Sequence, residues 1–354
     1  MNPTDPATTL LHQYIAQAPA DSLWWVDENI LLIPEQRPGI RAITNRYDLY
    51  QQLKARQWQV TFNDFDSGQI LPASLSCVLL RLPKEKALVH YLINQTARLL
   101  RPGGELWLIG DKSEGVRGFN KRAAERLGGP LSEHKVSAGL WFARISHDPQ
   151  QAGNDLDDQH YTETRPVTDR HGYSFISKPG LYGWQKVDPG SAFLIAELPT
   201  MLNQPFPLSG RVLDLGCGFG YLSLQTAGTQ TQLTCTDNNA AALHCCQANL
   251  EAQGILAEVV ASNAGDTLQG PYDILLCNPP FHSGFATNLD LTSRFIAASA
   301  RLLSPQGQAC FVVNKHIPLE QKAQRYFARI RLYADNGQFK LIHLSQPKHS
   351  QDAS

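Results

Sequence analysis

The 354-residue sequence has almost no net charge and no long apolar run. Lys and Arg number 31 against 32 Asp and Glu, so an overall positive charge that would favour nucleic acids is absent, and any such site must be a local patch. No apolar run approaches the roughly 18 residues of a membrane span. No Lys or Arg precedes Arg37, so we expect no signal peptide either. These absences predict a cytoplasmic protein.

The sequence also lacks the paired cysteines of common metal sites and disulfide frameworks. Its seven cysteines are odd in number, show no Cys-x-x-Cys spacing and mostly lie in apolar runs such as Leu275-Leu276-Cys277. Reduced, buried thiols are therefore expected. His244-Cys245-Cys246 is the only dense cluster, but neighbouring residues on a helix point in different directions and no second ligand pair follows. We expect no metal site.

The length and composition are enough for about two globular domains. Hydrophobic residues make up 42% of the chain, and a polar, acidic stretch over 148–160 has no apolar periodicity. We therefore predict a first domain over 1–147, a linker over 148–160 and a second domain over 161–354. Between Arg211 and Val313, short apolar strands alternate with helical segments, which is typical of an α/β fold with a mostly parallel, doubly wound sheet.

The sequence contains an internal repeat. Leu99 to Lys112 aligns without gaps on Leu302 to Lys315, and the strand before each segment ends in Arg81-Leu82-Pro83 or Asn278-Pro279-Pro280. A helix end, a Pro/Gly turn and an apolar strand form a common unit, so chance similarity is an alternative. We favour two tandem Rossmann-like domains. No glycine-rich turn follows the first apolar strand, so we expect a degenerate first domain without a cofactor site, with a structural or RNA-docking role.

A glycine-rich turn follows a short apolar strand in the second half. The pattern is Asp-x-Gly-x-Gly-x-Gly, formed by Asp214, Gly216, Gly218 and Gly220. Closely spaced glycines let the backbone turn sharply and approach a ligand. The spacing differs from the Gly-x-Gly-x-x-Gly of dinucleotide enzymes, and an acid ends the strand, which suits a ligand without a pyrophosphate such as S-adenosylmethionine. Asp237 follows the next strand, where a carboxylate can accept hydrogen bonds from both ribose hydroxyls.

A second motif, Asn-Pro-Pro-Phe from Asn278 to Phe281, follows another apolar strand. It could be an ordinary strand-ending turn. However, it lies about 60 residues after the glycine turn in the same predicted sheet, and ligands bind at the strand ends of such sheets. The carbonyls of Asn278 and Pro279 can accept both hydrogens of an exocyclic amine, which directs its lone pair at a methyl donor. Phe281 can stack on a flat base.

With these motifs the sequence resembles the Asn-Pro-Pro-Phe/Tyr class of S-adenosylmethionine-dependent amino methyltransferases. Within that class it is similar to the bacterial 16S ribosomal RNA guanine-N2 methyltransferase family, RsmC. The resemblance extends over nearly the whole chain, with departures at Trp184-Gln185 and in the first domain. It implies that Asp188 and Gly190 close the cofactor pocket and that Asn263 lies near the adenine. The matching segments are 179–182, 186–191, 214–220, 261–263 and 278–284.

The resemblance implies methyl transfer from S-adenosylmethionine to the exocyclic N2 amine of a guanine in 16S rRNA of the small subunit. Asn278, Pro279 and Phe281 would be the catalytic residues, and the protein would act as a monomer without a metal or a membrane. The same chemistry on 23S rRNA guanine, DNA adenine or protein glutamine is an alternative, although glutamine enzymes favour Tyr after Asn-Pro-Pro. A non-catalytic RNA-binding assembly factor is the alternative from another class.

Two segments carry local positive charge that RNA binding would need. Between 98 and 135 there are eight cations and five acids, and between 315 and 349 there are seven cations and two acids. Solvated surface charge is the alternative reading of both. The cations of the second segment are Lys315, Lys322, Arg325, Arg329, Arg331, Lys340 and Lys348.

Overall fold

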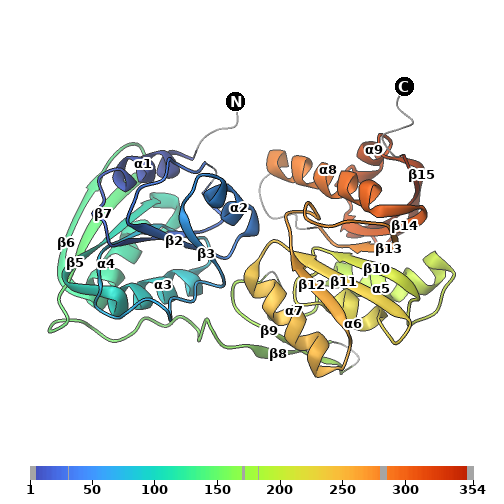
Figure 1. The fold of residues 1–354 in the computed structure, drawn as a ribbon, viewed down its shortest axis with the longest axis horizontal. Coiled ribbons are helices and arrows are strands. Elements are labelled where there is room, and N and C mark those ends of the chain that lie inside the picture. Colours follow the sequence, from blue (N-terminus) through green and yellow to red (C-terminus); the bar gives the residue numbers. More distant parts are fainter. Residues whose placement is uncertain (1–4, 31, 170–171, 182, 280–284, 349–354) are drawn as a thin grey trace. The chain divides into compact units, whose positions relative to one another are not determined.

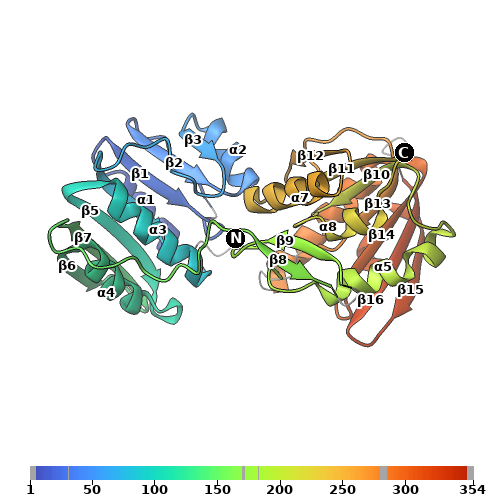
Figure 2. The same ribbon diagram turned by 90° about the horizontal axis from the view of Figure 1, so that it is seen from below.

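The computed structural model describes residues 5–30, 32–169, 172–181, 183–279 and 285–348. The chain divides into two units, Met1–Glu163 and Thr164–Ser354 (Figure 1). Each unit contains a seven-stranded sheet with helices packed on its faces (Figure 2). The prediction of two tandem Rossmann-like α/β domains is therefore confirmed.

The first unit begins with a helix capped by Asp5, whose carboxylate accepts hydrogen bonds from the backbone of the first turn. Its β1 is entirely buried, as are most residues of α3 and the stretch 106–110 of β5, which agrees with the apolar residues of these segments. Its elements are α1 (Pro6–Ile15), β1 (Ser22–Val26), β2 (Ile40–Thr44), α2 (Tyr47–Ala55), β3 (Gln59–Phe62), β4 (Leu75–Arg81), α3 (Lys86–Leu99), β5 (Leu100–Asp111), α4 (Val116–Leu127), β6 (Gly128–Lys135) and β7 (Leu140–His147).

The second unit starts with a short hairpin and then repeats the alternation of strands and helices. Two buried clusters fill its two sides, one beneath α5, α6 and α7 and the other beneath α8 and α9. Its elements are β8 (Arg165–Thr168), β9 (Ser174–Ser177), α5 (Pro189–Leu202), β10 (Gly210–Leu215), α6 (Tyr221–Thr226), β11 (Thr231–Asp237), α7 (Ala240–Ala252), β12 (Ala257–Ala261), β13 (Tyr272–Cys277), α8 (Phe285–Leu302), β14 (Leu303–Asn314), α9 (Leu319–Ala323), β15 (Phe327–Asp335) and β16 (Phe339–Pro347).

The two sheets have the same topology. Their strand orders are β3-β2-β1-β4-β5-β7-β6 and β12-β11-β10-β13-β14-β16-β15. In both sheets one strand, β7 or β16, is antiparallel to both of its neighbours. Cys77 pairs with Glu105 in one sheet as Ile274 pairs with Gln308 in the other, and a register shift precedes both pairs. Counting along this register places Arg81 where the second sheet has Asn278. The repeat detected in the sequence is therefore a repeat of structure.

The polar segment 148–160 contains neither helix nor strand and packs along α3 and α4 of the first unit. Asp155 forms an ion pair with Arg126 at 2.6 Å. The Asn94 side chain binds both the backbone N–H and the carbonyl of Leu156. These contacts extend the first unit through the segment that sequence analysis assigns to the linker.

Burial of the cysteines agrees with expectation, since all seven are free and buried. In the parts of the chain that the structure describes, no helix is both long and apolar enough to cross a membrane.

Candidate active site

The glycine-rich turn lies at the carboxyl end of β10, and its three glycines have φ angles of 85°, 55° and 90°. Residues with a side chain rarely adopt such backbone angles, so glycine at positions 216, 218 and 220 makes the turn possible. A Cβ atom at Gly218 would meet nothing within 4 Å, whereas one at Gly220 would lie 3.0 Å from the sulfur of Cys246. Gly218 therefore leaves the backbone open to a ligand, while Gly220 allows close packing on α7.

The Asp237 carboxylate lies against this turn. The backbone N–H of Gly218 donates to its Oδ2 at 3.0 Å, and that of Asn239 donates to its Oδ1 at 2.9 Å. Each carboxylate oxygen keeps a further lone pair for a ligand. The end of β12 lies beside Asp237, because the N–H of Ser262 donates a hydrogen bond to the Asp237 carbonyl. Asn263 directly follows Ser262. The structure thus brings Gly218, Asp237 and Asn263 to neighbouring strand ends.

Asp214 is fully buried beneath the turn. Its Oδ2 accepts a hydrogen bond of 2.6 Å from Ser223, and its Oδ1 has no hydrogen-bond partner among the described residues. Burial disfavours the charged form and raises the pKa of Asp214 to about 7. A buried carboxyl with one unused oxygen fits a place where a cationic ligand would complete its interactions. Sequence analysis did not find Ser223, because this residue belongs to no recognisable motif.

Asn278 follows β13, the strand that pairs with β10, so it and the glycine turn occupy adjacent carboxyl ends. Its Nδ2 donates to Asp188 Oδ2 and to Ser191 Oγ, both at 2.8 Å. Pro279 is buried, and Phe281 lies outside the described residues. The structure therefore joins two predicted site residues, Asn278 and Asp188, that are far apart in the sequence.

Asp188 and Gly190 form the start of α5. Asp188 is the N-cap and accepts a 2.8 Å hydrogen bond from the Ser191 N–H, and Pro189 occupies the first helical position. A Cβ atom at Gly190 would lie 3.0 Å from Asp188 Oδ2 and 3.1 Å from the Phe339 ring. Gly190 therefore permits the first turn of α5 to pack closely on β16. Sequence analysis assigned no role to Ser191, although it lies in the matching segment 186–191, and it missed Phe339, which belongs to no motif.

Asn249 supports the turn from behind. Its Nδ2 donates to the carbonyls of Phe219 and Ile176, and its Oδ1 accepts from the Ile176 N–H. One amide on α7 therefore ties the glycine turn to β9. Phe175 adds ring contacts to Phe219 and Tyr221. Sequence analysis also missed Asn249, because an asparagine within a helix belongs to no recognisable sequence motif.

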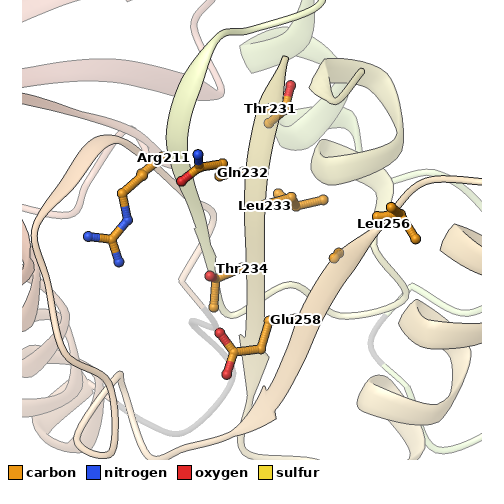
Figure 3. Close-up of a pocket in the computed structure, with 8 residues that line it drawn as sticks. Arg211, Thr231, Gln232, Leu233, Thr234, Leu256 and Glu258 are labelled. Atoms are coloured by element: carbon orange, nitrogen blue, oxygen red, sulfur yellow. The ribbon is translucent and has the colours of Figure 1, made fainter. Parts of the chain in front are cut away.

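A hollow of about 490 Å³ lies away from these residues, at the amino ends of β11 and β12 (Figure 3). It is lined by Arg211 and by residues from the starts of β11 and β12, including Gln232 and Glu258. Ligands of doubly wound sheets bind outside the carboxyl ends of the strands, so we do not assign the chemistry to this hollow.

The corresponding place in the first unit is filled by protein. Arg81 is 5% exposed and forms ion pairs with Asp5 at 3.2 Å and Glu114 at 2.7 Å. After β1 the chain continues as Asp27, a fully buried residue whose pKa burial raises, and Asn29 donates to its carboxylate. Side chains thus occupy the positions that hold an open glycine turn and Asn278 in the second unit.

Within the residues that the structure describes, no three His, Cys, Asp or Glu side chains are grouped so as to hold a metal ion.

Comparison with known families identifies the class. Residues 172–343 match the family model described as "Methyltransferase small domain", and residues 11–153 match "Methyltransferase small domain N-terminal". The fold and the glycine turn define a methyltransferase of this small-domain class.

Comparison with individual relatives identifies the family within this class. The chain belongs to the family of ribosomal RNA small subunit methyltransferase C, RsmC. It is 31% identical over 280 residues to the protein of that name from Shewanella loihica, which covers 77% of this chain and 79% of the relative. The relative from Shewanella denitrificans is 28% identical over 311 residues, or 86% of this chain and 87% of the relative. The family predicted from the motifs is confirmed.

A solved structure has the same fold over both units. It is the T. thermophilus 16S rRNA N2 methyltransferase RsmC, in complex with AdoMet and guanosine. The TM-score is 0.83 at 24% identity, and the match covers 97% of this chain and 92% of that one.

Proposed function

We propose that the second unit transfers a methyl group from S-adenosylmethionine to the exocyclic N2 amine of a guanine in 16S rRNA of the small ribosomal subunit. Family membership supports the reaction, as do the names of the relatives and the AdoMet and guanosine bound in the T. thermophilus RsmC structure. The observation that carries the proposal is the position of Asn278 at the end of β13, beside the open glycine turn of β10.

The residues present fit S-adenosylmethionine. The open backbone at Gly218, the free lone pairs of Asp237 and the unused oxygen of Asp214 are what a cationic nucleoside needs. When bound, this cofactor supplies an electrophilic methyl group on a sulfonium. The residues proposed to hold it are Asp188, Gly190, Asp214, Gly216, Gly218, Gly220, Asp237 and Asn263.

Two acceptors on this chain would prepare the amine. The lone pair of a guanine N2 amine is delocalised into the ring, which makes it a weak nucleophile. Asn278 Oδ1 and the Pro279 carbonyl would accept its two N–H groups and hold the lone pair toward the methyl group. Positioning and preorganised polar contacts would supply most of the acceleration. As the N–CH3 bond forms, the S–CH3 bond would break to leave a neutral thioether. The methylated amine would then carry a positive charge and lose one proton to water, so no strong base is required. Phe281 is proposed to stack on the base.

The paired cations of the segment 315–348 have structural roles. Lys340 is bound by both oxygens of Glu320, at 2.8 and 2.6 Å, and Lys315 lies 3.4 Å from Asp335. These two cations are largely neutralised by their partners. Lys348 donates to the Gln324 carbonyl, and three arginines of the segment are exposed.

Those arginines are Arg325, Arg329 and Arg331, for which no acidic partner is found among the described residues. Arg329 and Arg331 lie on β15, the edge strand of the sheet, and Arg331 lies 5.1 Å from the centre of the Tyr333 ring. Arginine beside an aromatic ring suits phosphate contact and base stacking. We propose this arginine edge as part of the RNA contact.

The test uses small ribosomal subunits that lack the modification. Wild-type protein with S-adenosylmethionine should produce N2-methylguanine in 16S rRNA, detected by mass mapping. Asn278→Ala should reduce single-turnover transfer by about 100-fold, the scale for losing a preorganised polar contact, because the amine loses an acceptor. Cofactor affinity should stay within a fewfold, and Asn154→Ala, at an exposed asparagine of the first unit, should leave the rate unchanged. Normal transfer by Asn278→Ala would overturn the mechanism.

A further inference from the structure

The hydrogen bonds of Asn278 determine which way its amide faces. Both hydrogens of its Nδ2 are used, one by Asp188 Oδ2 and the other by Ser191 Oγ, each at 2.8 Å. An amide has only these two donors. Its Oδ1 has no hydrogen-bond partner among the residues that the structure describes. The oxygen is therefore left to accept from whatever enters the site.

The reversed orientation of the amide is unfavourable because a carboxylate only accepts hydrogen bonds. Turning the amide over would place Asn278 Oδ1 against Asp188 Oδ2, oxygen against oxygen. Asp188 is itself fixed, since the same Oδ2 accepts the 2.8 Å bond from the Ser191 N–H that caps α5. A serine alone would not select the orientation, because its hydroxyl can donate as well as accept.

Gly190 holds this arrangement together. A Cβ atom there would come within 3.0 Å of Asp188 Oδ2 and 3.1 Å of the Phe339 ring. Any larger residue would push the carboxylate or the ring. Four consecutive residues, Asp-Pro-Gly-Ser, therefore have distinct roles. Asp188 caps α5 and Pro189 starts it, Gly190 leaves room for the carboxylate and the Phe339 ring, and Ser191 is the second acceptor for the Asn278 amide.

We propose that Asp188 is a positioning residue for methyl transfer, which it serves by fixing the Asn278 amide with Oδ1 toward the incoming group. The site then accepts an amine, which brings N–H donors, and rejects a ring carbonyl in the same place. This inference rests on the proposed function and adds a role that neither motif suggests alone.

The first test compares Asp188→Ala with Asp188→Asn. The alanine variant frees the amide and should slow single-turnover transfer by about 10-fold or more, the rate equivalent of a hydrogen bond to a charged group. Both variants are assayed at saturating S-adenosylmethionine, so that any loss of cofactor affinity at Asp188 does not enter the measured rate. The asparagine variant should keep most of the rate, because a single oxygen at position 188 accepts both bonds. Equal losses in the two variants would overturn the proposal, since the charge and not the orientation would then matter.

A double-mutant cycle separates positioning from a general effect on the fold. In the Asn278→Ala background there is no amide to orient, so adding Asp188→Ala should cost at most twofold more. A purely structural cap would give the same fold loss in both backgrounds, and that result would refute a positioning role.

A third measurement does not depend on activity. The side-chain NH2 of Asn278, identified by its loss in Asn278→Ala, should exchange its hydrogens slowly with solvent in wild type and in Asp188→Asn, but rapidly in Asp188→Ala. Equal exchange in all three would overturn the proposal. If slow exchange is seen and wild type methylates no RNA, the proposed function fails while the hydrogen-bond arrangement stands.

Discussion

Replacing Asp214 by asparagine should change how the stability of the second unit depends on pH. The pKa of this carboxyl is about 7 in the folded protein because burial disfavours its charge, against an ordinary value of 3.8. Below about pH 4 the carboxyl is protonated in both states. As the pH rises toward 7, the unfolded chain ionises and the folded protein does not, so stability is lost. The difference of about three pKa values corresponds to about 4 kcal/mol.

The asparagine variant cannot ionise and can still accept the hydrogen bond from Ser223. Calorimetry of both proteins between pH 4.5 and 8 should follow the unfolding transition that S-adenosylmethionine shifts. The melting temperature of Asp214→Asn relative to wild type should rise with pH and level off above about 7, by roughly 2–4 °C for each kcal/mol. Titrating groups that both proteins share cancel in this difference.

The variant should be the more stable protein at pH 8 and the weaker binder of the cofactor, because an ionised carboxylate attracts the positive charge of S-adenosylmethionine. Parallel melting curves across the pH range would refute the assignment of a raised pKa to Asp214.

Three further outcomes are expected. Gly218→Val should remove most of the rise in melting temperature that S-adenosylmethionine causes in wild type, whereas Gly103→Val, equally strained and equally open, should leave it intact; equal shifts would contradict the cofactor site. Arg329→Glu with Arg331→Glu should weaken RNA binding at least about 10-fold and flatten its salt dependence, with an unchanged rate at saturating RNA; an unaltered salt dependence would remove the arginine edge from the RNA contact. Calorimetric titration should find one S-adenosylmethionine per chain, and a ratio of two would contradict a first unit without a cofactor site.

The sequence was informative wherever the chemistry requires a local pattern. The glycine turn, Asp237 and the Asn-Pro-Pro run are each short, and the parallel sheet brings their strand ends together as expected. The repeat was also detectable, because helix ends and buried strands keep their apolar spacing. Contacts between distant segments were not detectable. The bonds from Asn278 to Asp188 and Ser191 span 87 to 90 residues.

The antiparallel ends of the sheets were missed for a related reason. β15 alternates exposed arginines with partly buried residues and reads as a charged surface segment in the sequence. Its position becomes clear only through its pairing with β16. An ion pair with Glu320 on α9 likewise distinguishes Lys340 from the exposed arginines, a distinction that a count of charges cannot make.

The shared topology of the two units has a consequence for synthesis of the chain. Tandem copies of one fold can exchange equivalent strands while they form, and such misassembly is a common failure of repeated domains. Here Trp24 on β1 pairs with Leu79 as Asp214 on β10 pairs with Leu276, so these two residues occupy equivalent positions. A swapped β10 would bring a carboxyl into an apolar core, and a swapped β1 would bring an indole beside Ser223. The divergence that closed the first site therefore also keeps each half of the nascent chain with its own strands.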